Sequence, residues 1–202
     1  MIIWGVMNLG TLKYLSFYSL IGEIGIVWDD KTKILKQVVL PDVNTNKQNY
    51  GKIAFSGVVT ETSPSEKIFQ LMSDIKDVIL GKEVHFNIER FDFSDLTDFQ
   101  KAVLTKQSEI PYGKVTSYKK LAEMIGKPKS ARPVANVLSN NLFPLVIPCH
   151  RTVRSDWTVG GYAGTTDGYY KEFLLEKEGI LIDNGIISKK FRYPDNKISK
   201  SI

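Results

Sequence analysis

Residues 146–151 read VIPCHR and contain Cys149, the only cysteine in a chain of 202 residues. The apolar run from Leu145 to Ile147 predicts a short buried strand. Pro148 has no N–H to donate to a neighbouring strand, so the predicted strand ends there and presents Cys149 at its end. A side chain at a strand end is well placed to line a cleft, which makes this thiol the first candidate for chemistry.

Cys149 has two interpretations. Free cysteine is among the most buried residue types, so the thiol could simply be a small apolar group in a core. Against that, His150 follows it directly and is one of only two histidines in the chain. Cationic neighbours lower the pKa of a thiol and favour the nucleophilic thiolate. The histidine and the basic surroundings therefore favour a reactive cysteine.

The basic charge is concentrated around this thiol. Residues 101–154 hold ten Lys and Arg residues and two Glu residues, whereas the rest of the chain holds 17 basic and 20 acidic residues. Such a stretch is often only a solvated face. The asymmetry is also typical of a phosphate-binding surface, which favours nucleic acid as a partner.

The composition, with 43% hydrophobic and 24% charged residues, is ordinary for a globular protein of one large or two small domains. A single cysteine cannot form an internal disulfide, and one Cys with two His cannot build a four-ligand structural zinc site of Cys and His alone. The N-terminus lacks signal-peptide features, and no later stretch is apolar for the ~20 residues of a membrane span. We therefore expect a cytoplasmic protein, or a nuclear one if the source is eukaryotic, with no membrane partner.

Residues 1–92 are predicted to form an α/β domain. Residues 12–27 and 34–40 are rich in β-branched and aromatic side chains, so they predict strands on either side of a turn at residues 29–30. Residues 41–50 are polar and predict a loop.

A helix and a further strand complete this predicted domain. Residues 63–66 read SPSE, which predicts a capping box with proline at the first helical position, ahead of an amphipathic helix to Ile79. Residues 84–88 predict a short strand, on which His85 is expected to have a structural role. The domain boundary is placed between residues 92 and 93.

Residues 93–202 are predicted to form an α-rich domain with short helices, a glycine-rich loop at residues 160–164 and a strand at residues 180–182. The linker KPK at residues 127–129 gives two of the helices a helix-turn-helix pattern. The predicted helices run from Thr97 to about Ser108, from Ser117 to Gly126, from Ser130 onward, and from Asp167 to Gly179.

Several separated motifs over residues 97–180 resemble the O6-alkylguanine-DNA alkyltransferases. They occur in that family's order and spacing: IPYGKV at residues 110–115, Ser117 with Tyr118, Ala131 with Arg132, Asn141, IPCHR at residues 147–151, GYAG at residues 161–164, Lys171, and Glu178 with Gly179. The resemblance implies an N-terminal α/β domain of ribonuclease H-like fold and a winged-helix-type C-terminal domain with a helix-turn-helix.

The resemblance also implies direct-reversal DNA repair. Members of that family flip an O6-alkylguanine, or less well an O4-alkylthymine, out of double-stranded DNA and move its alkyl group irreversibly to their own cysteine. Each molecule acts once and needs no cofactor. Some members also bind zinc, but their zinc ligands are missing from this sequence, so no metal is expected. We expect a monomer that binds double-stranded DNA.

Residue roles carry over by position. Cys149 is the expected nucleophile, activated by His150 through a water, with Glu178 orienting His150. Asn141 is expected to tie the helix-turn-helix to the active-site segment. Tyr118 is expected to stabilise the departing guanine at its N3 edge.

Further expected contacts concern binding. The backbone carbonyls of Cys149 and Thr152 are expected to read the exocyclic amine of guanine, and the Ala163 amide is expected to donate to its O6. The remaining binding positions are Arg132, which would replace the flipped base in the stack, Tyr162 as a wall of the alkyl pocket, Gly164 in the same loop, and Lys171, which would steady that loop.

After Arg132 the chain has Pro133-Val134-Ala135 where the family usually has Ala-Val-Gly, so it departs at Pro133 and Ala135, and a second arginine further along that helix is absent. These departures put DNA affinity in question. Three other interpretations stay open: a lesion sensor without catalysis, against which Cys149 argues; a winged-helix regulator with an incidental thiol; and a cysteine hydrolase, which also combines thiol, histidine and acid.

Overall fold

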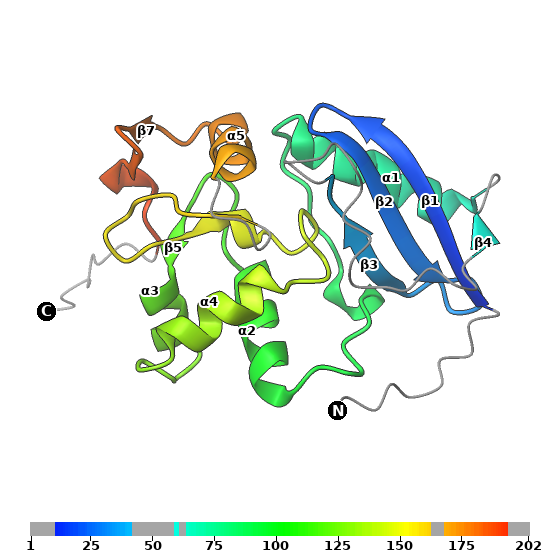
Figure 1. The fold of residues 1–202 in the computed structure, drawn as a ribbon, viewed down its shortest axis with the longest axis horizontal. Coiled ribbons are helices and arrows are strands. Elements are labelled where there is room, and N and C mark those ends of the chain that lie inside the picture. Colours follow the sequence, from blue (N-terminus) through cyan, green and yellow to red (C-terminus); the bar gives the residue numbers. More distant parts are fainter. Residues whose placement is uncertain (1–10, 42–58, 61–63, 163–167, 194–202) are drawn as a thin grey trace, which may run out of the picture.

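The computed structural model describes residues 11–41, 59–60, 64–162 and 168–193. Figure 1 shows a sheet covered by one helix at one end of the molecule and a group of short helices at the other. The described part is thus a mixed α/β fold, in agreement with the coarse prediction.

The sheet has the order β3-β2-β1-β4, in which β1, β2 and β3 are antiparallel and β4 lies parallel to β1. Their bounds are β1 Leu12–Ser19, β2 Gly22–Asp29, β3 Leu35–Val39 and β4 Val59–Thr60. The prediction of one strand over residues 12–27 was wrong, because a turn at residues 20–21 folds it into a hairpin. Gly22 permits this turn, since its φ of +109° is one that L-residues rarely adopt.

Helix α1, Glu66–Ile79, covers one face of the sheet (Figure 1). Ile68, Ile75 and Ile79 recur at helical spacing and are buried against it. The predicted start was wrong, because Ser65 is the N-cap, without a side-chain hydrogen bond, and Pro64 precedes the helix. Ser63 lies outside the described residues.

The predicted strand at residues 84–88 is absent. This segment is extended without strand pairing and runs into a short 3-10 helix, η2, Ile88–Arg90. Its apolar residues still pack on the core, and the alternation that suggested a strand reflects that packing. The side chain of His85 is 89% exposed and its Nε2 lies 3.6 Å from the Glu83 Oε1, so its expected structural role stays a prediction.

The helical part follows the predicted caps closely. Helix α2, Asp98–Ser108, begins with a complete capping box between Thr97 and Gln100. Ser117 caps α3, Tyr118–Met124, by accepting from the Lys120 N–H. Ser130 is the N-cap position of α4, Ala131–Ser139, but its side chain makes no capping hydrogen bond.

The strand predicted at residues 145–147 was wrong. Leu145 has a φ of +70°, which is incompatible with a strand, and residues 144–146 form a turn. Cys149 instead opens a 3-10 helix, η3, Cys149–Arg151. The strand β6, Thr152–Val153, follows it and pairs in parallel with β5, Thr116–Ser117.

Helix α5, Tyr169–Lys177, has Gly168 as its N-cap, and the predicted cap Asp167 lies outside the described residues. The predicted strand at residues 180–182 begins only at its last residue. The remaining elements are β7 Ile182–Asp183, β8 Ile186–Ile187 and the 3-10 helix η4 Lys189–Phe191.

The hydrophobic core is continuous between the sheet and the helices. Phe143 stacks on Phe91 with ring centroids 5.3 Å apart, and the Val38 N–H at the sheet edge donates to the Leu142 carbonyl at 2.8 Å. The segment that leads to Cys149 is therefore held by the edge of the sheet. The domain boundary at residues 92 and 93 stays a prediction.

Candidate active site

Cys149 is almost completely buried, with 6% of its surface exposed, and its N–H donates to the Ile147 carbonyl at 2.7 Å. Burial raises the pKa of the Cys149 thiol, while Asn141, Lys171 and the Tyr162 hydroxyl oppose that increase. At neutral pH the group is therefore a protonated thiol. A base nearby is needed to make it a strong nucleophile.

Asn141 holds the sulfur from one side. Its Nδ2 donates to the Cys149 Sγ at 3.3 Å and to the Ile147 carbonyl at 3.2 Å, and its Oδ1 accepts from the Phe143 N–H at 3.0 Å. These bonds fix the orientation of the Asn141 carboxamide, so that its NH2 group faces the Cys149 sulfur. A donor stabilises the thiolate more than the thiol.

His150 is fully buried, and its Nε2 lies 2.8 Å from the Glu178 Oε1. Because a carboxylate only accepts, Nε2 carries the proton of the neutral ring, and the lone pair is on Nδ1. That Nδ1 has no hydrogen-bond partner among the described residues. Burial lowers the pKa of His150 and outweighs Glu178, which raises it. The ring is therefore a neutral base near pH 7.

Glu178 follows α5 directly and gathers several donors. It accepts from the Arg151 Nε at 2.9 Å and 3.0 Å and from the Gly113 N–H at 3.0 Å. Burial disfavours its charge, but His150 and Arg151 lower the pKa of Glu178 to about 2. The carboxylate is thus a fixed anion. No role was predicted for Arg151, although its position beside His150 was an available signal.

Gln107 on α2 is a second residue that the sequence did not reveal. It is fully buried, its Nε2 donates to the Pro148 carbonyl at 2.7 Å, and its Oε1 accepts from the Thr152 hydroxyl. The side chain therefore bridges both ends of the turn that carries Cys149. A glutamine within an amphipathic helix gives no sequence signal for such a contact.

Lys171 and Tyr118 flank the thiol from two helices. Lys171 on α5 is 1% exposed, and its Nζ lies 5.5 Å from the centroid of the Tyr118 ring on α3. Burial lowers the pKa of Lys171 to about 8, while Cys149 favours its charge. Its Nζ also donates to the Gly161 carbonyl at 3.4 Å. Burial raises the pKa of Tyr118, and Cys149 adds to that increase.

Tyr162 completes the described surroundings of the sulfur. It is buried and packs edge-on against the His150 ring at 6.5 Å between centroids. Burial raises the pKa of Tyr162 well above its ordinary value. Ala163 and Gly164, which follow it, lie outside the described residues.

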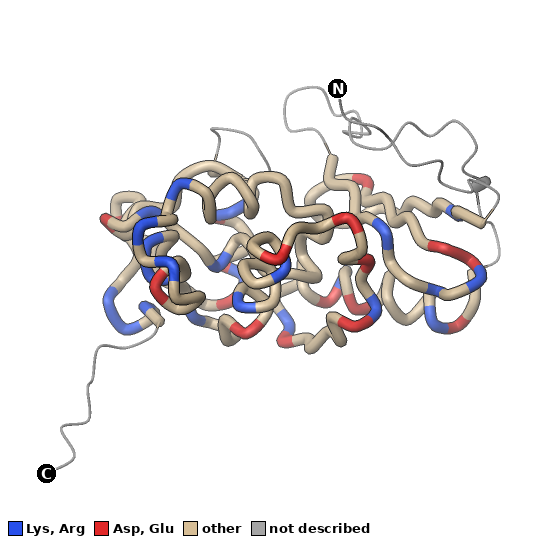
Figure 2. The backbone as a smooth tube through the Cα atoms, turned by 90° about the horizontal axis from the view of Figure 1, so that it is seen from below, with Lys and Arg blue, Asp and Glu red and all other residues tan. Residues whose placement is uncertain are grey.

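Arg132 differs from this buried group, because it is exposed, near the start of α4. Figure 2 shows Lys and Arg positions gathered at the end of the molecule that carries the short helices, whereas acidic and basic positions mix at the sheet end. The Cys149 thiol is thus buried, whereas Arg132 is exposed at the end of the molecule where the Lys and Arg positions gather.

Neither a metal cluster nor a membrane span is found in the described ranges. No group of three or more His, Cys, Asp and Glu residues there is arranged to hold a metal ion. None of the helices described is both long and apolar enough to cross a bilayer.

The chain is similar to a well-defined group of proteins. Residues 98–180 match the family described as 6-O-methylguanine DNA methyltransferase, DNA binding domain. A methylated-DNA–protein-cysteine methyltransferase of Methanothermobacter thermautotrophicus is 36% identical over 161 residues, which cover 80% of this chain and 82% of that protein. The protein of the same name from Methanosarcina barkeri is 43% identical over 101 residues, 48% of this chain and 63% of that protein.

Solved structures agree at the level of the fold. Mycobacterium tuberculosis OGT, in a crystal structure with DNA, superposes with a TM-score of 0.67 at 24% identity, covering 82% of this chain and 92% of that one. The O6-methylguanine-DNA methyltransferase of Pyrococcus kodakaraensis has a TM-score of 0.62 at 23% identity, covering 84% and 99%. With a relative matched over most of both chains and a lone thiol held beside a buried His–Glu pair, this chain belongs to the methylated-DNA–protein-cysteine methyltransferase family.

Proposed function

We propose that this protein repairs DNA by direct reversal, moving the alkyl group of O6-alkylguanine, and less well of O4-alkylthymine, onto the sulfur of Cys149. The observation that carries the proposal is the thiol held by Asn141 next to a neutral His150 whose orientation Glu178 fixes. A nucleophile, a base and a group orienting the base are the parts that such a transfer needs.

The proton leaves the thiol before or during the attack. His150 Nδ1 is the accepting atom, because Nε2 is engaged by Glu178, and a water carries the proton from sulfur to ring. The sulfur then forms a bond to the alkyl carbon as the bond from that carbon to O6 breaks. The electron pair stays on guanine, which takes up a proton, so the thiol proton is balanced by the one that guanine regains.

The thioether product explains single use. Its S–C bond has no leaving group that water or a second thiol displaces readily, so the protein is consumed in one reaction and no cofactor takes part. Lys171 favours the attacking thiolate, since its ammonium is buried beside the sulfur.

The departing base is stabilised by groups around the thiol. We assign the N3 edge of guanine to Tyr118, the O6 atom to the Ala163 amide and a wall of the alkyl pocket to Tyr162, with Gly164 in the same loop. The carbonyls of Cys149 and Thr152 recognise the exocyclic amine. The buried position of Cys149 supports this arrangement, because a base still stacked in a duplex cannot reach it.

DNA is bound by the helix-turn-helix formed by α3 and α4. Arg132 takes the place of the flipped base in the stack, and the small residues Ala131 and Ala135 let the α4 backbone approach the minor groove. Exposed basic residues in this helix-turn-helix, Lys119, Lys127 and Lys129, supply phosphate contacts.

The finer features of the fold belong to the same proposal. The strand order β3-β2-β1-β4 with a covering helix supports a ribonuclease H-like N-terminal domain up to residue 92. Helices α2 to α4 with the β5–β6 pair support a winged-helix-type domain from residue 93. We further propose that the protein acts as a monomer in the cytoplasm, or in the nucleus of a eukaryote.

The test is mass spectrometry of the whole protein and of its peptides after mixing with a short duplex that contains one O6-methylguanine. We expect a gain of one CH2 unit, stoichiometric and without turnover, on the peptide that holds Cys149. The Cys149→Ser variant should bind the same duplex and gain nothing. Binding without transfer by the parent protein would instead favour a lesion sensor, and repeated turnover of an ester would favour a hydrolase.

A further inference from the structure

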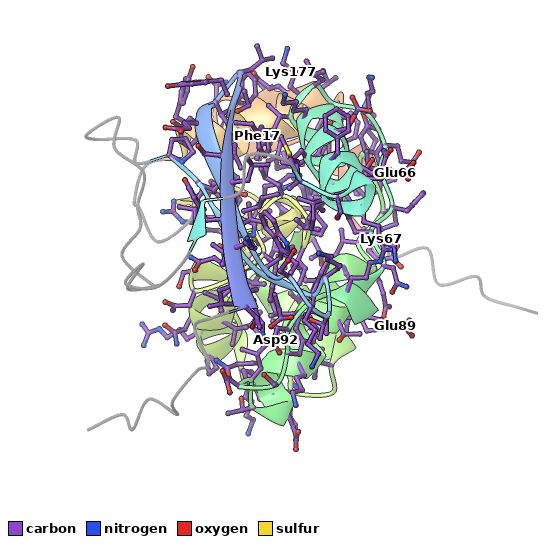
Figure 3. All side chains as sticks on the ribbon, turned by 90° about the vertical axis from the view of Figure 1, so that its right-hand side faces the viewer. Phe17, Glu66, Lys67, Glu89, Asp92 and Lys177 are labelled. Carbon is purple, nitrogen blue, oxygen red and sulfur yellow. The ribbon has the colours of Figure 1, made fainter. Side chains whose placement is uncertain are left out.

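The turn that follows α1 packs closely against Lys177, the residue before Glu178. Gly81, in this turn, has a φ of +83°, and a Cβ atom placed on it would lie 2.3 Å from the Lys177 carbonyl oxygen and 2.8 Å from its carbonyl carbon. The backbone of the N-terminal part thus touches the backbone of α5 at its last residue. Figure 1 shows this end of α1 facing α5, and Figure 3 shows Lys177 beside the two helices.

Tyr112 joins the same turn to the Glu178 carboxylate. The Tyr112 hydroxyl donates to the Gly81 carbonyl, and the N–H of the next residue, Gly113, donates to the Glu178 Oε2 at 3.0 Å. The guanidinium of Arg151, which also binds Glu178, lies over the Tyr112 ring at 5.8 Å from its centroid. The α1 turn therefore reaches Glu178 by two routes, through Lys177 and through Tyr112.

We propose that Gly81 and Tyr112 are positioning residues for the alkyl transfer, through which the end of α1 sets the place of Glu178 and so the orientation of His150. The inference rests on the proposed function, because it gives the turn after α1 a role in the proposed alkyl transfer. Neither residue contacts the sulfur in the geometry described above; both act through the carboxylate.

The physical reason lies in how Glu178 selects the ring atom that accepts the proton. With Oε1 at 2.8 Å, the Nε2–H form of His150 is favoured and Nδ1 is left as the base. If the Lys177 backbone moves away, the carboxylate retreats and the Nδ1–H form gains population. A ring in that form cannot accept the thiol proton at Nδ1, so transfer slows although the fold persists.

The decisive variant is Gly81→Ala, with Gly185→Ala as its matched control. Gly185 has a φ of +75°, close to that of Gly81, and a Cβ atom there would meet nothing within 4 Å. Both variants therefore carry the same backbone strain, but only Gly81→Ala forces the α5 backbone to shift. Tyr112→Phe is the milder second variant, because it removes the hydroxyl and keeps the ring under Arg151.

Two quantities are measured on the full chain at a temperature where every variant is folded. The first is the single-turnover rate of methyl transfer from duplex DNA at saturating protein. We expect Gly81→Ala to lower it roughly tenfold to a hundredfold, a part of what a positioned base contributes. Gly185→Ala should keep the parent rate, Tyr112→Phe should fall between, and the affinity for lesion DNA should be unchanged in all three.

The second quantity is the tautomer of the neutral His150 ring, that is, which ring nitrogen carries the proton, read from the 15N chemical shifts. The chain has two histidines, and the exposed His85 gives an internal reference signal. The parent should show Nε2–H, and Gly81→Ala a mixture of both forms. Should Gly81→Ala and Tyr112→Phe match Gly185→Ala in rate and in ring shifts, the contact is only packing and the proposal fails.

The two proposals fail in different ways. If the parent transfers no methyl group, the proposed function is wrong, yet the ring shifts still report whether Gly81 and Tyr112 position His150. If Gly81→Ala does not fold, Tyr112→Phe decides alone, and a parent-like rate with parent-like shifts would overturn the inference.

Discussion

The sulfur of Cys149 lies in surroundings with opposing effects on its charge. Burial disfavours the thiolate, and Asn141, Lys171 and Tyr162 favour it. The balance keeps a protonated thiol in the resting protein, which protects the single reactive group from side reactions until a base and a substrate are in place.

Replacing Lys171 by Met should raise the pKa of the Cys149 thiol further, because the ammonium that favours the thiolate is removed. The rate of alkylation by a small thiol reagent at pH 6 to 7 measures this, and the rate should fall in the variant because less thiolate is present. In the parent, the support from Lys171 fades above pH 8, since its own pKa is about 8, so parent and variant should converge there. Lys189→Met, at an exposed position, is the control. An equal fall in both variants would contradict the assignment.

Gln107→Ala should destabilise the protein by about 2–4 kcal/mol, because it leaves the Pro148 carbonyl and the Thr152 hydroxyl buried without a partner. Urea denaturation gives the free energy of unfolding. Gln70 is the matched control: its amide bonds to Asp74 on the surface, so Gln70→Ala should change stability by no more than about 0.5 kcal/mol. Similar values for both would show that the Gln107 bridge contributes little.

Among the elements, the helices of the C-terminal half were well predicted. The strand predicted at residues 34–40 is confirmed as β3, but the strands predicted at residues 84–88 and 145–147 were wrong. Helix starts depend on hydrogen bonds within a few residues, as in the capping box of Thr97 and Gln100, so the local sequence carries the information. Strands need partners. The segment at residues 84–88 has strand-like alternation but no strand pairs with it, and the apolar residues before Cys149 are buried in a turn.

The N-cap residues of α2 and α4, Thr97 and Ser130, provide a test of the observed helix starts. Thr97→Ala should lower the free energy of unfolding by about 1 kcal/mol, since the side chain accepts from the Gln100 N–H. Ser130→Ala should have almost no effect, because the Ser130 side chain makes no capping hydrogen bond. Thermal or chemical denaturation of the two variants checks both values, and equal losses would argue against the observed cap geometry.

In the whole molecule, one continuous core joins the sheet to the thiol-bearing segment. The buried carboxylate of Glu178 ties together several residues of the C-terminal half. Glu178 binds residues from two distant stretches of the chain, Gly113 in one and the adjacent His150 and Arg151 in the other. Acid should therefore loosen the active site and the fold together.

The pH dependence of stability follows from the low pKa of Glu178. Its folded value of about 2 lies below the ordinary 4.5, so its contribution is fully present above about pH 4.5 and is lost as the pH falls toward 2. Glu178→Gln should flatten this part of the stability curve, whereas Glu176→Gln, on the exposed side of α5, should not. Denaturation at a series of pH values decides, and parallel curves for parent and Glu178→Gln would contradict the pKa.

By itself the sequence determined the candidate nucleophile, the caps of two helices and the segment in which basic charge is concentrated. A lone thiol beside a histidine, the caps of α2 and α3, and the excess of Lys and Arg over residues 101–154 are all local properties, visible without a fold. The family motifs extended this to Asn141, Lys171 and Glu178 by position.

Only the tertiary structure decided how these groups meet. The Asn141 donor on the sulfur, the Gln107 bridge and the contact of Gly81 with Lys177 join residues that are separate in the chain. Such contacts depend on the packing of α1, α2 and α5 around the Cys149 turn. No local pattern encodes that packing, because it arises from burying all the apolar surfaces of the chain at once.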